Sequence, residues 1–64
     1  MAKNRYSIRM EYADGTPGLS FHDTLTAAKK AARSPTHGGR RVELAVVCER
    51  LSNGAEVTIQ TFRP

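Results

Sequence analysis

The chain has 64 residues, a net charge of +4 at pH 7, 39% hydrophobic residues and four aromatic side chains. This length predicts a single domain (1–64) with a thin aliphatic core, and it excludes a second domain and a deep substrate cavity. The single cysteine, Cys48, excludes an internal disulfide, and no apolar run is long enough for a membrane span or a signal peptide. We therefore expect a soluble, cytoplasmic protein whose charge favours acidic partners.

Apolar and polar residues alternate along residues 6–12, which predicts a half-buried strand. The Asp14-Gly15 dipeptide that follows favours a two-residue hairpin turn, because both residues tolerate positive φ angles. Pro17 indicates that the next strand lies at a sheet edge, since proline cannot donate a hydrogen bond to a ladder.

A two-residue turn would place Met10 opposite Leu19 and Ile8 opposite Phe21, with all four side chains on the apolar face. This agreement predicts a second strand at residues 19–22. The first hairpin would then contribute a continuous apolar face to the core.

Residues 25–33 are predicted to form a helix because they contain four alanines and good helix formers. Asp23 or Thr24 can cap its first turn. Leucine and alanine gather on one side of the helix and the cations on the other, so the helix can lie close to a sheet. Ser34-Pro35 ends the helix, because the residue before proline avoids the α region. Residues 36–39 are predicted to be a flexible connection.

Alternation resumes along residues 41–51, the longest predicted strand. The residues expected to face the helix are Val42, Leu44, Val46 and Cys48. Asn53-Gly54 is a strong hairpin signal, and a two-residue turn there would pair Cys48 with Ile59 and Arg50 with Val57. Phe62 then falls on the outer face of the sheet unless a bulge turns it inward.

The predicted order is strand, strand, helix, strand, strand. This is an α+β domain in which one antiparallel sheet (ββαββ) packs one face against a single helix. If the second strand does not form, the layout becomes βαββ with the same apolar face.

Five cations and no acid occupy residues 29–41, and they are Lys29, Lys30, Arg33, Arg40 and Arg41. The rest of the chain carries five bases and six acids, so this basic cluster holds the net positive charge. Gly38-Gly39 permits a close backbone approach, and the cluster can neutralise phosphates or contact an acidic protein groove. The alternative is a solvated helix end whose cations offset the helix macrodipole.

A second candidate surface lies on the predicted outer face of the sheet. Ala45, Val47 and Phe62 would form a small apolar patch rimmed by charges, which is typical of a protein contact or a homodimer seam. The alternative is a scatter of exposed apolar side chains without a partner. The face is charge-balanced and offers one stacking ring, so it does not favour binding of single-stranded nucleic acid.

No catalytic or metal-binding motif is recognised. His22, His37 and Cys48 do not occur in pairs at the spacing of metal ligands. Cys48 is expected to be a core residue, and Gly38-Gly39-Arg40 matches no phosphate-binding motif. We therefore expect no enzyme activity, no metal and no cofactor.

The layout, with Asp23–Arg33 as its helix and an Asn-Gly hairpin behind it, resembles small accessory proteins encoded by phages and mobile elements. Inhibitors of bacterial defence, anti-CRISPR proteins among them, are similar in size; this likeness rests on pattern and implies no site residue. We predict a non-enzymatic inhibitor or adaptor that engages a larger protein or nucleoprotein complex through the basic cluster or the outer patch. The alternative is direct, largely sequence-independent nucleic-acid binding through the same cluster. No membrane partner is expected.

Overall fold

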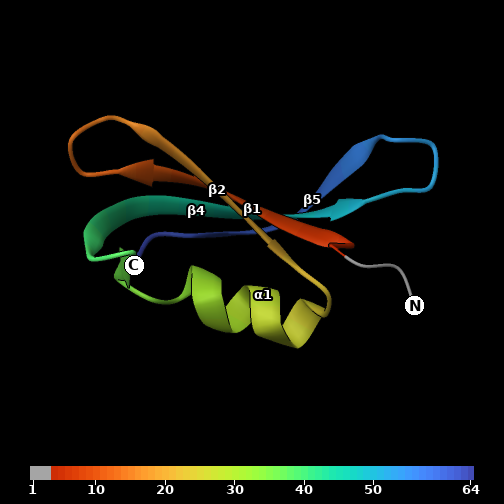
Figure 1. Cartoon of the computed structure of the whole chain (residues 1–64), viewed down its shortest axis with the longest axis horizontal. Helices are drawn as coiled ribbons and strands as arrows, with labels where there is room; N and C mark the ends of the chain where they lie inside the picture. Colours follow the sequence, from red (N-terminus) through yellow and green to blue (C-terminus); the bar gives the residue numbers. More distant parts are fainter. Residues whose placement is uncertain (1–3) are drawn as a thin grey trace.

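The computed structural model describes residues 4–64 and contains one helix and five strands in that part of the chain. In chain order the elements are β1 (Tyr6–Tyr12), β2 (Pro17–His22), α1 (Leu25–Ala32), β3 (Thr36–His37), β4 (Arg40–Arg50) and β5 (Glu56–Phe62). All strand pairs are antiparallel, in the order β2-β1-β4, with β3 and β5 both paired to β4. The sheet is curled like half a barrel, and α1 runs along one of its faces (Figure 1). The α+β class is confirmed. The predicted order ββαββ differs from the observed order because the prediction did not include the short strand β3.

The β1–β2 hairpin turns over three residues rather than two. Gly15 has φ +85°, and its N–H donates to the carbonyl of Tyr12 at 2.9 Å, while the N–H of Tyr12 donates to the carbonyl of Thr16 at 2.9 Å. This is a type I turn followed by a bulge residue with positive φ. The carboxylate of Asp14 closes the turn by accepting from the backbone N–H of Thr16 at 3.1 Å.

The longer turn shifts the register of β2 by one residue. Leu19 pairs with Arg9 and Phe21 pairs with Ser7, so the predicted partners of Leu19 and Phe21 are wrong. A one-residue shift moves side chains to the opposite face of a strand. Leu19 and Phe21 therefore point away from α1, with 54% and 45% of their surfaces exposed.

The β4–β5 hairpin repeats the three-residue turn. Gly54 has φ +87°, and its N–H donates to the carbonyl of Leu51 at 3.0 Å. The observed pairs are Cys48–Thr58 and Arg50–Glu56, where the sequence predicts Cys48–Ile59 and Arg50–Val57. The predicted turn position is correct, and the predicted register is wrong by one residue from the turn to Cys48, beyond which a bulge restores the predicted pairing.

A bulge in β4 reverses which side chains in the second half of the strand face α1. Val42 and Leu44 oppose consecutive residues of β1, which leaves Glu43 as the extra residue. Beyond the bulge Ala45 and Val47 face α1 and are 1% and 0% exposed. The residues that the sequence wrongly places on the helix side are Leu44, Val46 and Cys48.

Phe62 also lies on the helix side. It pairs with Ala45, as the sequence predicts, and Ala45 has been turned inward by the bulge in β4. Phe62 therefore packs partly buried against the core cluster. The expected outer patch of Ala45, Val47 and Phe62 is thus wrong, because all three residues belong to the core side of the sheet.

The helix forms where the sequence predicts it. Its N-cap is Thr24, whose hydroxyl accepts a backbone N–H of the first turn at 3.2 Å, while Asp23 instead accepts the N–H of Asn4 at 2.7 Å. Ala28 and Ala32 are buried against the sheet. The buried core between the two layers consists of Ile8, Met10, Tyr12, Ala28, Ala32, Val42, Ala45 and Val47.

The predicted flexible connection after α1 is instead a tight hairpin. Thr36 pairs with Arg41 and His37 with Arg40, so that only two residues form the turn. These residues are Gly38 and Gly39, with φ of +60° and +79°. Positive φ at both positions is the signature of a type I′ hairpin turn, which glycine adopts without strain.

Gly18 in β2 is required by the ring of Tyr12. A Cβ atom at Gly18 would lie 2.6 Å from Cε2 and 2.8 Å from the hydroxyl oxygen of Tyr12. The ring itself is held in place, because the guanidinium of Arg40 lies 4.0 Å from its centroid and Nδ1 of His37 lies 3.2 Å from its hydroxyl. The ring cannot move aside without losing these contacts.

We therefore expect Gly18→Ala to lower the free energy of unfolding by about 1–3 kcal/mol, the usual cost of overpacking. In a Tyr12→Leu background the same substitution should be neutral or stabilise by up to about 1 kcal/mol, since alanine restricts the unfolded chain. Urea unfolding of the four variants measures both effects. An equal loss in the two backgrounds would show that the ring is not the cause.

Candidate binding surfaces

Three ion pairs tie the strands together and use half of the acids of the chain. They are Arg5–Glu49 at 2.6 Å, Arg9–Glu56 at 2.5 Å and Arg40–Asp14 at 2.9 Å. None of the three involves a residue of α1. Within residues 4–64, the cations outside these pairs are Lys29, Lys30, Arg33, Arg41, Arg50 and Arg63.

The structure divides the predicted basic cluster. Lys29 and Lys30 lie in the last turn of α1, and Arg33 is its C-cap; Lys30 and Arg33 are exposed and Lys29 is half-buried. Arg41 precedes the inward-facing Val42, so the alternation along β4 puts it on the sheet face away from α1. The helix cations and Arg41 therefore do not share one face.

Arg40, the remaining member of the predicted cluster, is engaged within the protein. Its guanidinium stacks over the ring of Tyr12, donates to a carboxylate oxygen of Asp14 at 2.9 Å, and donates to the hydroxyl of Thr16. These contacts bind β4 to the β1–β2 turn. Arg40 thus has a structural role that its position beside Arg41 in the sequence does not reveal.

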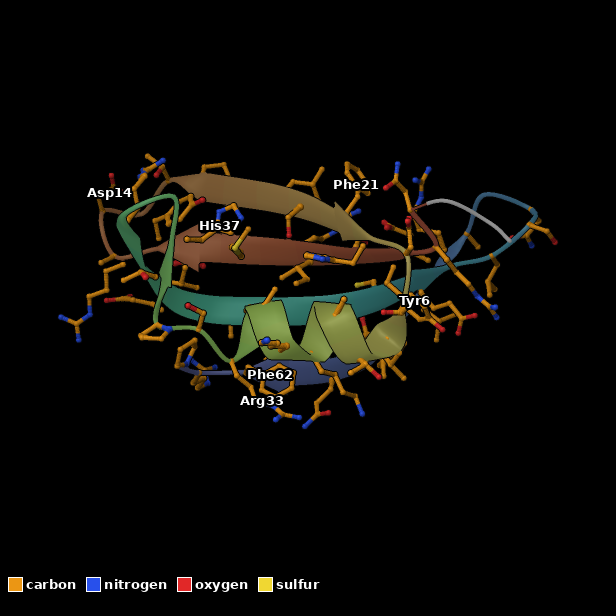
Figure 2. The ribbon with its side chains drawn as sticks, turned by 60° about the horizontal axis from the view of Figure 1, so that its bottom comes forward. Tyr6, Asp14, Phe21, Arg33, His37 and Phe62 are labelled. Carbon is orange, nitrogen blue, oxygen red and sulfur yellow. The ribbon has the colours of Figure 1, made fainter. Side chains whose placement is uncertain are left out.

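The backbone at Arg63 lies near the C-terminal end of α1, which carries the helix cations. Arg63 follows Phe62, which pairs with Ala45 at the middle of β4, and the C-terminus lies beside the C-terminal end of α1 (Figure 1). Figure 2 shows Phe62 and Arg33 on the same side of the helix. Sequence reasoning missed Arg63, although the correctly predicted Phe62–Ala45 pair indicates its position. The set of Lys29, Lys30, Arg33 and Arg63 is called the basic surface below.

The sheet face away from α1 carries a polar network. The hydroxyl of the buried Ser7 donates to Glu56 at 2.8 Å, and Arg9 donates to the other carboxylate oxygen at 2.5 Å. The hydrogen bond from Arg9, and then that from Ser7, lowers the pKa of Glu56 below its usual value. Arg50 lies over the ring of Phe21 at 5.3 Å. The exposed Phe21 is therefore partly shielded by a cation on this face.

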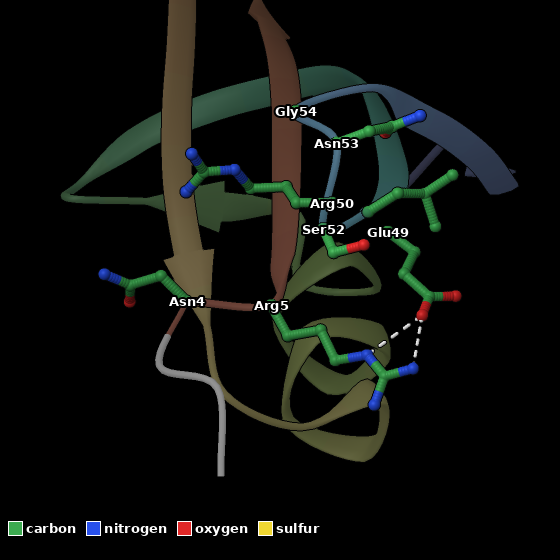
Figure 3. Close-up of a pocket in the computed structure, with 8 residues that line it drawn as sticks. Asn4, Arg5, Glu49, Arg50, Ser52, Asn53 and Gly54 are labelled. Atoms are coloured by element: carbon green, nitrogen blue, oxygen red, sulfur yellow. Dashed lines mark hydrogen bonds and ion pairs between the residues drawn. The ribbon is translucent and has the colours of Figure 1, made fainter.

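An open hollow of about 700 Å³ lies at the end of the β4–β5 hairpin. Figure 3 shows the Arg5–Glu49 ion pair on one side of it and the Asn53-Gly54 turn on the other. The residues that line it include two guanidinium groups and one carboxylate, and neither a histidine nor a cysteine. This arrangement can hold polar groups.

The two histidines and the cysteine are held apart from one another. His37 lies 3.2 Å from the hydroxyl of Tyr12, and Nε2 of His22 lies 3.0 Å from the hydroxyl of Ser20. Cys48 is buried. Among residues 4–64, no group of three histidine, cysteine or acidic side chains is arranged to hold a metal ion.

Comparison with protein-family models, with curated proteins and with solved structures found no match. In the described part of the chain, no helix has the length and apolar character needed to cross a membrane. The functional interpretation therefore depends on the geometry and charge of the surfaces themselves.

The β1–β2 turn has a measurable titration signature. Hydrogen bonds from the hydroxyl and then the backbone of Thr16, followed by that from Arg40, lower the pKa of Asp14 from 3.8 to about 2. A lowered folded-state pKa stabilises the fold fully above the unfolded value, and this contribution is lost as the pH falls towards 2.

We expect Thr16→Val to raise the pKa of Asp14 more than Arg40→Gln does, because the Thr16 hydroxyl has the largest effect. Carboxyl-detected NMR titration of the two variants measures both shifts. A larger rise in Arg40→Gln would mean that the ion pair, and not the turn, controls this carboxylate.

Proposed function

We propose that this chain is a small, non-enzymatic binding protein that engages an acidic surface of a larger protein or nucleoprotein complex through the basic surface. One observation carries the proposal. The three ion pairs neutralise acids at sites away from α1, so the positive charge at the end of the helix has no internal partner in the described residues. Uncompensated charge of one sign attracts and orients a partner of the opposite sign.

The helix that carries these charges packs against the sheet. Ala28 and Ala32 are buried against the sheet, and their small side chains let α1 lie close to it. Lys29 and Arg33 are four residues apart and therefore share one flank, where like charges repel by about 0.2–0.5 kcal/mol. Compensation of the helix macrodipole offsets part of this repulsion. Compensation of the macrodipole does not require Arg63, which lies just beyond the end of β5, near the same end of the helix.

Direct nucleic-acid binding is the second candidate, because the same cations can contact phosphates. The structure offers little for stacking bases beside them. Tyr6 and Phe62 pack against the core, Tyr12 is buried, and Phe21 lies on the opposite face under Arg50. Four phosphate contacts would give a salt dependence with a log–log slope of about −3.6 on duplex DNA. We favour a protein surface for this reason.

The resemblance to phage-encoded inhibitors makes a bacterial cytoplasmic complex the first partner to seek. The test is capture of partners from a bacterial lysate on the immobilised protein, with and without nuclease. A protein partner should remain bound after nuclease treatment, and its association rate should fall with added salt.

We expect Lys30→Glu/Arg33→Glu to slow association with the captured partner about tenfold or more, since steering depends on this charge. The matched control is Arg41→Glu/Arg50→Glu, which changes the net charge equally and reverses two other cations that lie outside the ion pairs. The control should bind nearly as well as the parent chain. Equal losses in both variants, or loss of the partner with nuclease, would contradict the proposal.

A further inference from the structure

β2 leaves one of its edges open. In the β1–β2 turn the N–H of Tyr12 donates to the carbonyl of Thr16, and hydrogen-bonded pairs alternate along an antiparallel ladder. Gly18, Ser20 and His22 therefore direct their backbone groups towards β1. The groups that point outward are the N–H and C=O of Leu19 and Phe21 and the C=O of Pro17. Pro17 has no N–H to leave unpaired at this edge.

The two edges of the sheet are protected differently. The β4–β5 ladder is interrupted by a bulge at Ile59, and β5 begins with the ion-paired Glu56. Bulges and charges are the usual devices that prevent edge strands from pairing with other chains. The six residues of β2 (Pro17–His22) carry no lysine, arginine or acid, and the strand exposes the side chains of Leu19 and Phe21. Apart from its first residue, this edge is unprotected.

We propose that β2 pairs antiparallel with β2 of a second copy of this chain, across a twofold axis at Ser20. In this register Leu19 forms a hydrogen-bonded pair with the partner's Phe21, and Phe21 with the partner's Leu19. Each pair exchanges two main-chain hydrogen bonds, so the edge satisfies its own donors and acceptors. The exposed leucine and phenylalanine side chains then lie directly opposite each other on one face, as cross-strand pairs do in stable sheets.

The charge distribution permits a second copy in this arrangement. Each chain carries +4, but β2 itself contains no lysine, arginine or acid, and the cation over its exposed face is Arg50, 5.3 Å from the ring of Phe21. The C-terminal end of α1 points towards the side of the molecule that holds the β1–β2 turn (Figure 1). A twofold axis at Ser20 therefore points the C-terminal ends of the two α1 helices in opposite directions.

The paired strands are short, so the interface is small. Interfaces below about 1,200 Å² belong to weak or transient assemblies, and we expect the dimer to dissociate on dilution. Sedimentation velocity over a concentration series should show a shift from monomer to dimer for the parent chain. A chain that stays monomeric at every concentration would overturn the proposal.

A charged residue on the open edge should abolish the dimer. Leu19→Lys adds a charge at a site that is 54% exposed on β2, and Val57→Lys adds the same charge at a site that is 49% exposed on β5. Dimerisation should be lost in Leu19→Lys and retained in Val57→Lys. The opposite result would place the interface on β5. Lys30→Glu/Arg33→Glu should still dimerise, so failure of the proposed partner binding and failure of this dimer are separate results.

The register can be tested by crosslinking. Residues opposite each other at a non-hydrogen-bonded position have Cα atoms about 4.5 Å apart, within the range that a disulfide spans. Ser20→Cys, in a Cys48→Ser background, should therefore form a covalent dimer on oxidation. Gln60→Cys in the same background is the control at the other edge. If Ser20→Cys crosslinks no faster than Gln60→Cys, the proposed twofold pairing is wrong.

Discussion

The bulge at Glu43 determines which side chains of β4 face the core. Every second residue of a strand faces the same way, so one extra residue reverses the side chains that follow it. Val42 lies in the core on one side of the bulge, and Ala45 and Val47 lie there on the other. Because β5 pairs with this part of β4, Phe62 is turned inward as well. The packing of Ala45, Val47 and Phe62 on the helix side of the sheet follows from this one change of parity.

The sequence predicts the local elements well and their registers poorly. The helix, its cap at one of the two candidates Asp23 and Thr24, and the positions of the two glycine turns are set by neighbouring residues, and these are confirmed. Asp14-Gly15 and Asn53-Gly54 suit either a two-residue turn or a three-residue turn with glycine last, since both need positive φ at glycine. The sequence cannot separate the two. Residues 42–48 are nearly all apolar, so the sequence pattern does not show which face of β4 is buried.

The exposed surfaces, like the strand registers, depend on contacts between residues that are far apart in the sequence. Lys29, Lys30 and Arg33 were predictable because a helix fixes their relative positions. The structural role of Arg40 was not predictable, because its ring partner Tyr12 and its carboxylate partner Asp14 lie far from it in the sequence, Asp14 by 26 residues. The exposed Leu19 and Phe21 result from the register of β2, and the open edge that we assign to a second copy has the same origin. Function on this small scaffold therefore follows from register as much as from charge.

The most direct test is to determine which face of β4 contacts α1. NMR measures this through nuclear Overhauser effects between methyl groups. The account predicts effects from the Ala28 methyl to the methyl groups of Ala45 or Val47, which share the core with it. Effects from Ala28 to Leu44 and Val46 instead would show an unbulged strand. In that case the faces described above would be reversed, and the account would be wrong.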